Sequence, residues 1–401
     1  MRYSYLLIII LMLGFCKQQV SQTSHILPDT GYILRPGAER TELYFPELQG
    51  KKVACVANQT SMIGQVHLVD SLVHAGIDLV KVFAPEHGFR GQAEAGEEIS
   101  NQIDPRTGVP IVSLYWTRKK PSSEDLEGID VVLFDIQDVG TRFYTYISTM
   151  TYVMEACTEN AVPFIVLDRP NPHGGYVDGP VLEKGFESFV GLHPVPIVYG
   201  MTMGEYARMV NEEGWLKNGI KARLTVIPVE KYTHSSPYSL PVAPSPNLPN
   251  DLAICLYPSL CLFEGTQVSV GRGTDYPFQV IGHPYYILGS FLFTPESRPE
   301  ALHPLYEGQH CFGSSLMGTM DLCMKDRRLN LSWLINHYQF WNEFVNDRGS
   351  FFNDYFDKLA GNSTLRQQII EGNTEDQIRA SWQEGLIKFK SIRQKYLLYP
   401  E

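Results

Sequence analysis

The sequence predicts an α/β fold, with a Rossmann-like parallel sheet in a first lobe and a second, smaller α+β lobe. Short apolar runs alternate with helical patterns from residue 51 to about residue 229, which is the order of elements in a parallel α/β sheet. A proline-rich segment then interrupts the pattern at residues 241–249. The chain has 401 residues, of which 44% are hydrophobic and 19% charged, so it can fold into two lobes of ordinary globular composition.

Six segments have the continuous apolar character of strands that are buried on both faces. They are residues 53–57, 79–84, 111–115, 131–136, 164–167 and 224–229. Helical periodicity lies between them at 67–74, 143–157 and 203–215. Thr202 and Glu205 have the spacing of a capping box at the start of the last of these helices. This alternation predicts a largely parallel sheet with right-handed crossovers.

The turn after the first predicted strand argues against a dinucleotide cofactor. It reads Asn-Gln-Thr-Ser-Met-Ile-Gly at 58–64 and lacks the GxGxxG pattern that binds a pyrophosphate. We therefore expect no NAD and no other cofactor. Open α/β sheets bind their ligands outside the carboxyl ends of the strands, so we expect the functional residues in the loops that follow the strands.

The segment Pro-Val-Ala-Pro-Ser-Pro-Asn-Leu-Pro at 241–249 is rigid and extended, which is typical of a boundary between lobes. We therefore predict a Rossmann-like catalytic lobe at residues 30–240 and an α+β lobe at residues 250–401. The second lobe contains Gly/Thr-rich turns and ends in helical sequence. There Thr374 and Gln377 have the spacing of another capping box.

Residues 1–22 have the features of an export signal. A basic residue near the N-terminus precedes an apolar run at 6–15 that is too short to span a bilayer. Leu-Gly-Phe-Cys at 13–16 resembles the cleavage box of bacterial lipoproteins, in which Cys16 would carry a lipid, and the alternative is ordinary cleavage within 18–24. We therefore expect an exported protein, periplasmic or at the outer surface, whose membrane contact is limited to a lipid anchor at Cys16.

Charge and cysteine content bear on further partners. The net charge of −11 argues against nucleic acid, because affinity for a phosphate backbone is built from Lys and Arg. Six cysteines remain without Cys16, an even number that permits disulfides in an exported protein. However, Cys55, Cys157 and Cys255 lie in apolar runs, where cysteine behaves as a small buried hydrophobe, so we expect mostly free thiols.

The histidines do not have the spacing of a metal site. His87, His173, His193 and His283 are far apart in the sequence, and no HxxxH or Cys/His zinc pattern is present. A GxSxG nucleophile elbow is also absent. We therefore expect neither a metal ion nor a serine nucleophile.

The loop after the second predicted strand is a candidate reactive loop. It reads Pro-Glu-His-Gly-Phe-Arg-Gly at 85–91 and brings a carboxylate, an imidazole and a guanidinium within five residues. Glu86 is the candidate for acid–base chemistry, which requires partial burial to keep a carboxyl group protonated near neutral pH. The alternative is a polar turn in which Glu86 merely pairs with Arg90.

A second group of polar residues follows the fourth predicted strand. Asp135 and Asp138 lie at its end, and Arg142 and Tyr144 come at the start of the next helix, whose N-terminus favours an anion. One of the two aspartates could instead be a helix cap.

Further polar residues occur in a third strand-end loop and in the second lobe. The loop Leu-Asp-Arg-Pro-Asn-Pro-His-Gly-Gly at 167–175 is stiffened by its prolines and offers Asn171 and His173 to a polyol. The second lobe adds Glu264, Arg272, Thr274 and His283. We expect its loops to close over the first lobe.

Six long motifs occur along the chain. They are PEHGFRG at 85–91, FDIQDVGTRFYTY at 134–146, LDRPNPHGG at 167–175, GLHPVPIVYGMTMGEYA at 191–207, PSPNLP at 244–249 and FEGTQVSVGRGTDYPF at 263–278. Together they resemble the exo-β-N-acetylmuramidase family, from about residue 31 to residue 399. The resemblance implies an active site in the cleft between the two lobes. It also implies hydrolytic release of N-acetylmuramic acid from the non-reducing end of peptidoglycan fragments.

The resemblance also implies roles for individual residues. It makes Glu86 the leading catalytic group, which we interpret as the general acid. Glycoside hydrolysis commonly needs a second carboxylate, although a 2-acetamido sugar can use its own amide oxygen. The candidates for that carboxylate, in falling order, are Asp138, Asp135 and Glu264. Arg142 or Arg272 would bind the lactyl carboxylate of muramic acid. The other candidate substrate contacts are His87, Arg90, Tyr144, Asn171, Asn247, Thr274 and His283.

Two functions of other classes remain open from the sequence. A non-catalytic protein that binds the cell wall would also need an export signal and loops suited to sugars. A metal-dependent hydrolase or deacetylase could act on the same polymer. Muropeptide binding without release of muramic acid would support the first, and activity that survives EDTA would rule out the second.

Overall fold

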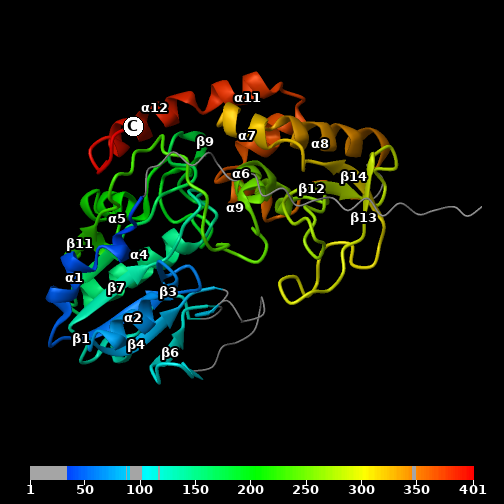
Figure 1. Ribbon diagram of the computed structural model, residues 1–401. Helices are drawn as coiled ribbons and strands as arrows, with labels where there is room; N and C mark the ends of the chain where they lie inside the picture. The colour runs from blue at the N-terminus through cyan, green and yellow to red at the C-terminus, as the bar shows by residue number, and fades with distance from the viewer. Residues whose placement is uncertain (1–33, 87, 91–101, 116–117, 346–348) are drawn as a thin grey trace, which may run out of the picture.

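The computed structural model describes residues 34–86, 88–90, 102–115, 118–345 and 349–401 (Figure 1). The predicted leader at 1–22, with Cys16, lies outside these residues, and so does His87. Within the described residues, seven strands form one sheet in the order β11-β8-β7-β1-β4-β6-β5. The strands are β1 (Lys52–Ala57), β4 (Asp78–Ala84), β5 (Gln102–Ile103), β6 (Pro110–Ser113), β7 (Val131–Asp135), β8 (Phe164–Leu167) and β11 (Leu224–Ile227).

The strand order is that of a Rossmann-like sheet. All neighbouring strands run parallel except β5, which pairs antiparallel with β6 at one edge. The chain moves outward from the central strand β1 through β4 and β6, and then continues on the other side of β1 with β7, β8 and β11. The predicted α/β class and all six predicted strands are confirmed. The reversal between β1 and β7 is a topological switch point, where such sheets bind ligands.

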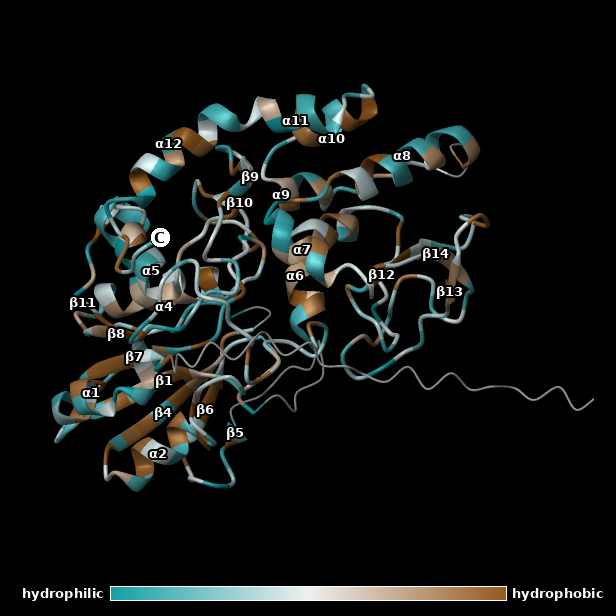
Figure 2. Cartoon of the chain, turned by 45° about the horizontal axis from the view of Figure 1, so that its top comes forward, coloured by the Kyte–Doolittle hydropathy of each residue, from teal (hydrophilic) through white to brown (hydrophobic). Residues whose placement is uncertain are grey.

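The two faces of the sheet belong to two hydrophobic clusters. Along β1, the side chains of Val53, Cys55 and Ala57 point into one cluster, and those of Ala54 and Val56 point into the other. This is the alternation that the pleat imposes on a strand with both faces covered. The strands are accordingly among the most hydrophobic parts of the chain (Figure 2).

Helices cover both faces of the sheet. They are α1 (Thr41–Leu48), α2 (Leu68–His74), α3 (Ser123–Leu126), α4 (Tyr146–Glu159) and α5 (Met203–Glu212). Helices α2, α4 and α5 confirm the three predicted ones, and Thr202 with Glu205 forms the predicted capping box. Helix α4 begins three residues later than predicted, because residues 143–145 form part of the turn that follows β7.

Shorter elements complete the first lobe and its border. They are η1 (Gly37–Glu39), η2 (Lys217–Gly219) and the antiparallel pairs β2 (Met62–Ile63) with β3 (Val66–His67) and β9 (Asp178–Val181) with β10 (Pro196–Val198). None of these was predicted from the sequence.

The second lobe is smaller and mixed. Its antiparallel sheet has the order β12-β14-β13. Its elements are α6 (Asp251–Leu260), η3 (Cys261–Gly265), β12 (Val280–His283), β13 (Phe291–Phe293), β14 (Cys311–Ser315), α7 (Met320–Asp326), α8 (Ser332–Phe344), α9 (Phe356–Ala360), α10 (Thr364–Ile370), α11 (Glu375–Ser381) and α12 (Gln383–Arg393). Thr374 and Gln377 form the predicted capping box of α11.

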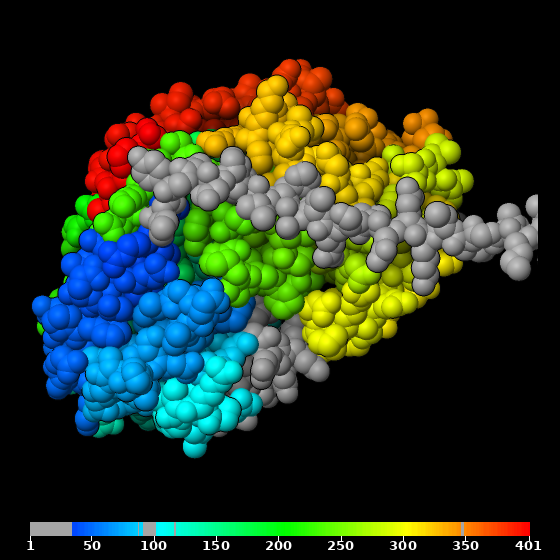
Figure 3. All heavy atoms as spheres, in the orientation of Figure 1, coloured from blue at the N-terminus to red at the C-terminus, as the bar shows by residue number. Residues whose placement is uncertain are grey.

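The C-terminal helices return to the first lobe (Figures 1 and 3). Arg393 of α12 donates to the carbonyl oxygen of Gly200 at 2.7 and 2.9 Å, and the Tyr399 hydroxyl donates to Asp168 after β8 at 2.5 Å. One hydrophobic cluster runs from Ala54 of β1 to Tyr396 near the C-terminus. The two lobes therefore share a core.

The cysteines correct one expectation. Cys255 of α6 and Cys323 of α7 form a disulfide, although Cys255 was expected to be a free, buried thiol because it lies in an apolar run. Helix α7 packs beside α6 and brings its own cysteine against that position. Cys55 and Cys157, together with Cys261 and Cys311, are free and buried.

Across the described residues, we find no helix of the length and apolarity that crossing a membrane requires.

Candidate active site

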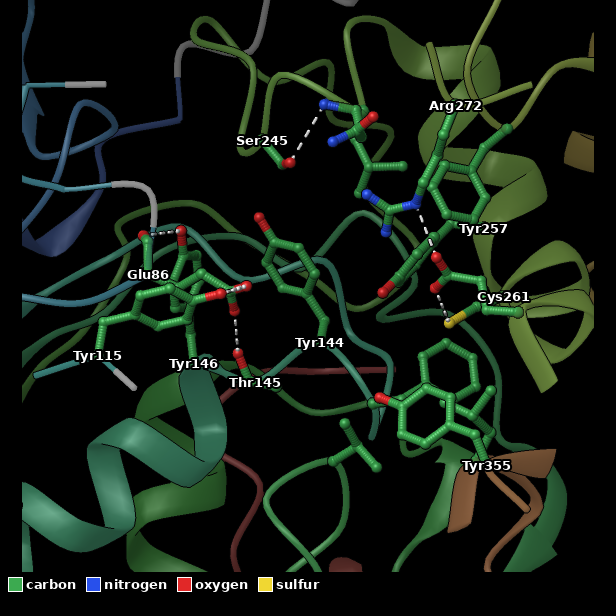
Figure 4. A pocket seen from close by; sticks show the side chains of 17 residues that line it. Glu86, Tyr115, Tyr144, Thr145, Tyr146, Ser245, Tyr257, Cys261, Arg272 and Tyr355 are labelled. Carbon is green, nitrogen blue, oxygen red and sulfur yellow. Dashed lines mark hydrogen bonds and ion pairs between the residues drawn. The ribbon is translucent and has the colours of Figure 1, made fainter. Parts of the chain in front are cut away.

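A cavity of about 330 Å³ opens at the carboxyl ends of β4 and β7 and is lined by residues of both lobes (Figure 4). First-lobe residues on its wall are Glu86, Tyr115, Phe143, Tyr144, Thr145, Tyr146 and Val190. The other wall contains Ser245, Asn247, Leu248, Tyr257, Cys261, Glu264, Arg272, Phe278, Tyr355 and Leu359. The cavity therefore lies where a Rossmann-like sheet is expected to bind its ligand.

Glu86 follows β4 directly and reaches one end of the cavity. Its Oε1 accepts a hydrogen bond from the Tyr115 hydroxyl at 3.0 Å, and its Oε2 accepts one from Thr145 Oγ1 at 3.1 Å. Gly88 has a φ of 76°, which permits the sharp turn after the strand. The carboxylate is therefore held by two neutral hydroxyl groups at the edge of the cavity (Figure 4).

The turn between β7 and α4 forms the floor beside Glu86. The Tyr146 hydroxyl accepts from Asn58 Nδ2 at 3.0 Å and lies 3.4 Å from the backbone oxygen of Glu86, to which it donates. The Tyr144 hydroxyl donates to the carbonyl oxygen of Pro244 at 2.7 Å, in the proline-rich segment. The ends of β1, β4 and β7 and the segment between the lobes are thus joined through two tyrosines.

The opposite wall holds a second carboxylate in a different setting. Arg272 Nε donates to Glu264 Oε1 at 2.7 Å, and Cys261 Sγ lies 3.4 Å from Glu264 Oε2. Figure 4 shows Arg272 and Cys261 on the side of the pocket away from Glu86. The guanidinium of Arg272 also lies 5.2 Å from the centre of the Phe278 ring. A cation therefore sits next to one of the two carboxylates that line the cavity.

Asn247 and three phenols supply further polar groups. Asn247 is buried, and its Nδ2 donates to the carbonyl oxygen of Glu300 at 2.9 Å. Among the described residues, no group donates to its Oδ1. Burial raises the pKa of Tyr115, Tyr257 and Tyr355, and the nearby Glu86 carboxylate adds to this effect at Tyr115. These phenols therefore stay neutral and can donate hydrogen bonds to a ligand.

The structure brings five of the predicted site residues to the cavity, and they are Glu86, Tyr144, Asn247, Glu264 and Arg272. Sequence reasoning missed Tyr115, Thr145, Tyr146, Ser245, Tyr257, Cys261 and Tyr355. Thr145 and Tyr146 fall within the quoted motif at 134–146, and Ser245 falls within the one at 244–249, so these motifs held a signal. Tyr115 and Tyr355 fall in no motif.

Arg142 has a structural role instead of the predicted contact with a lactyl group. Its side chain is inaccessible to solvent and donates to four backbone carbonyl oxygens at 2.7–2.9 Å. They belong to Pro180, Val195, Leu359 and Ala360. Its donors join segments of the two lobes, and Arg142 is not among the residues that line the cavity.

Asp135 and Arg90 also form structural ion pairs. Asp135 is inaccessible and accepts from Arg169 Nε and Nη2 at 2.6 and 2.8 Å, so it faces a buried guanidinium and not a substrate. Arg90 pairs with Asp70 and Asp104 at 2.7 Å. The alternative interpretation of the 85–91 loop, a pair between Glu86 and Arg90, therefore does not hold.

Asp138 is buried beneath the turn and does not line the cavity. Its Oδ2 accepts from the backbone N–H of Gly140 at 2.7 Å and from the Tyr199 hydroxyl. Burial raises the pKa of Asp138 to about 6, although these hydrogen bonds act in the opposite direction. Asp138 is therefore not placed to act as the second catalytic carboxylate.

Three other predicted contacts stabilise local backbone. Asn171 Nδ2 donates to the carbonyl oxygen of Met201 at 2.8 Å, and Thr274 Oγ1 donates to that of Gly271 at 2.7 Å. His283 Nδ1 accepts from the backbone N–H of Tyr285 at 3.0 Å. All three side chains are buried away from the cavity, and His87 lies outside the described residues.

Within the part of the chain that is described, no three His, Cys, Asp or Glu side chains cluster as metal ligands would.

Two carboxylates line facing walls of a tyrosine-rich cavity between a Rossmann-like lobe and a smaller lobe, and paired carboxyl groups of this kind are common in glycosidases. The chain matches two family models: exo-beta-N-acetylmuramidase NamZ, N-terminal, at residues 53–252, and exo-beta-N-acetylmuramidase NamZ, C-terminal, at residues 255–399. The chain belongs to this family of glycosidases.

Individual relatives agree with this assignment. The peptidoglycan beta-N-acetylmuramidase NamZ of Bacillus subtilis (strain 168) is 40% identical over 376 residues, which cover 89% of each chain. A crystal structure of a DUF1343 family protein from Bacteroides fragilis NCTC 9343 has a TM-score of 0.85 and 45% identity, over 92% of this chain and 100% of that one. A second such protein from the same organism has a TM-score of 0.73 and 28% identity, over 91% and 99%.

Proposed function

We propose that this enzyme removes N-acetylmuramic acid from the non-reducing end of peptidoglycan fragments, with Glu86 as the general acid. The observation that carries the proposal is the pair of carboxylates in one cavity, of which Glu86 has neutral hydroxyl partners and Glu264 has a guanidinium partner. The Glu264 carboxylate is already paired with a guanidinium, whereas Glu86 has only hydroxyl partners, which can hydrogen-bond to a carboxylate or to a carboxylic acid. Glu86 is therefore the carboxyl group suited to deliver a proton.

The reaction needs a proton transfer from Glu86, a second one back to Glu86, and stabilisation of a cation-like C1. As the bond between C1 and the leaving oxygen breaks, Glu86 donates its proton to that oxygen. The acetamido oxygen of the substrate attacks C1, and the charged Glu264 polarises the acetamido N–H. Water then attacks C1, breaks the bond to the amide oxygen and returns a proton to Glu86. Muramic acid is released and the starting state is restored.

Substrate recognition would use groups on the second-lobe wall. The Nε of Arg272 donates to Glu264. The same guanidinium has further N–H donors, which can bind the lactyl carboxylate of muramic acid. Asn247 lines the cavity, and its amide, whose buried Oδ1 has no donor among the described residues, would bind a sugar hydroxyl or the acetamido N–H. The phenols of Tyr257 and Tyr355 offer ring surface and hydroxyl donors to the sugar.

The first test is Glu86→Gln with a disaccharide that ends in N-acetylmuramic acid. Because the amide cannot donate a carboxyl proton, we expect kcat to fall by about 100- to 10,000-fold while the substrate still binds. Released muramic acid is measured by mass spectrometry, and Glu127→Gln, at an exposed glutamate outside the cavity, is the control.

Near-normal turnover by Glu86→Gln would overturn the assignment of the general acid. Binding of the disaccharide without release by the wild-type protein would favour a non-catalytic cell-wall binding protein. Loss of wild-type activity in EDTA would favour a metal-dependent hydrolase.

The proposed lactyl contact predicts a selective effect of Arg272→Gln. Without the guanidinium, kcat/KM for an aryl N-acetylmuramide should fall by about 10- to 100-fold, the value of a charge-assisted hydrogen bond. The matched aryl N-acetylglucosaminide lacks the lactyl group and should lose much less. An equal loss on both substrates would reject the contact and leave Arg272 as a partner of Glu264 alone.

A further inference from the structure

Thr145 occupies the N-cap position of α4 but does not cap that helix. A threonine that caps a helix has extended backbone angles and accepts a hydrogen bond from a backbone N–H of the first turn. The side chain of Thr145 makes no such bond, and its Oγ1 donates to Glu86 Oε2 at 3.1 Å instead. The backbone angles of Thr145 are helical (φ −72°, ψ −1°), so its side chain is not placed to cap the helix and its hydroxyl is available to the proposed general acid.

The hydrogen bond from Thr145 completes a set that fixes the carboxylate of Glu86. Tyr115 donates to one oxygen from the segment after β6, and Thr145 donates to the other from the start of α4. Tyr146, the first residue of α4, donates to the backbone oxygen of the same glutamate at 3.4 Å. Because the two carboxylate oxygens have donors on different elements, the carboxylate plane cannot rotate freely. Fixing such a plane is what a proton donor requires.

We propose that Thr145 is a positioning residue that holds Glu86 in the orientation for proton transfer. The proposal rests on the role of Glu86 as general acid. In it, the residue at the start of α4 orients the carboxyl group of Glu86. A hydroxyl group suits this task in both halves of the reaction. It can donate to the carboxylate, and it can donate to the carbonyl oxygen of the protonated acid while the acid proton points to the leaving oxygen. Thr145 is partly exposed at the cavity wall, between the buried Tyr144 and Tyr146, so its hydroxyl can rotate there.

The test compares Thr145→Val, which keeps the shape and removes the hydroxyl, with Thr145→Ser, which keeps the hydroxyl. For Thr145→Val on the muramic disaccharide we expect kcat to fall by about 10- to 100-fold with KM changed by less than about threefold, because only alignment is lost. Thr145→Ser should recover kcat to within about threefold of the wild type. Thr158→Val is the matched control, since its hydroxyl donates to Met154 near the other end of α4.

A purely structural role would give different results. Because Thr145 makes no capping hydrogen bond, Thr145→Val should melt within about 1–2 °C of the wild type. A kcat of Thr145→Val within about threefold of the wild type would overturn the proposal. So would a loss of kcat that Thr145→Ser does not restore, or one that follows a large drop in melting temperature.

The double variant separates this proposal from the function on which it rests. If Thr145 acts through Glu86, adding Thr145→Val to Glu86→Gln should cause little further loss of kcat. An additive loss would show that Thr145 acts elsewhere and would overturn the proposal. Full activity of Glu86→Gln alone would instead overturn the general-acid assignment. An inactive Glu86→Gln with a fully active Thr145→Val would reject the positioning role and leave the function intact.

Discussion

Arg142 joins backbone segments that are far apart in the sequence. Two of its hydrogen bonds go to Pro180 and Val195, and two go to Leu359 and Ala360 at the end of α9. Burial lowers the pKa of Arg142 to about 9. Leu359 also lines the cavity, so this buried guanidinium fixes part of the second-lobe wall against the first lobe.

Replacing Arg142 should therefore lower the stability of the protein more than it affects the recognition of substrate. Arg142→Met leaves four buried carbonyl oxygens without their donors, and we expect the free energy of unfolding to fall by roughly 3–5 kcal/mol. Arg223→Met, at an exposed position, is the control in urea denaturation followed by circular dichroism. Unchanged stability, with a loss confined to muramide substrates, would restore the contact first predicted from the sequence.

Residue types near strand ends could be predicted, but the directions of their side chains could not. Glu86 and Arg142 both follow a strand in a polar motif, and one lines the cavity while the other is buried. Spacing along the chain does not tell which of them meets solvent. Tyr115 and Tyr355 could not be singled out, because the chain has 22 tyrosines and many of them pack in the hydrophobic core.

Long elements with a clear period were predictable from the sequence. The six parallel strands and the helices α2, α4 and α5 carry continuous apolar runs or helical periodicity, and the capping boxes of α5 and α11 are those predicted from the sequence. The start of α4 was placed too early because residues 143–145 continue its apolar pattern while forming the cavity floor. At this boundary the chain forms part of the cavity, although the local sequence pattern is that of a helix.

Short elements and long-range cross-links were not predictable. β9 and β10 have four and three residues, too few to show a period, and they are stabilised by pairing with each other. The disulfide joins cysteines 68 residues apart. Cysteine spacing alone does not determine which thiols pair, and Cys255 stands in sequence that favours a buried, unpaired thiol.

At the scale of the whole molecule, the cavity depends on two lobes that share one core. Glu86 comes from the end of β4, whereas Glu264 comes from η3, which follows α6 directly. The C-terminal helices pack back onto the first lobe through Arg393 and Tyr399, so the two walls are fixed relative to each other. The family resemblance predicted a cleft between the lobes. The sequence did not tell which of the three candidate carboxylates faces Glu86 across it.

The central claim is that Glu86 gives its proton to the leaving oxygen, and leaving-group dependence tests it most directly. Wild-type and Glu86→Gln enzyme would be compared on the natural disaccharide and on a dinitrophenyl N-acetylmuramide, whose leaving group needs no protonation. We predict that Glu86→Gln loses at least about 100-fold in kcat/KM on the disaccharide and only a small factor on the activated substrate. Equal losses on both substrates would contradict the role of Glu86 as general acid.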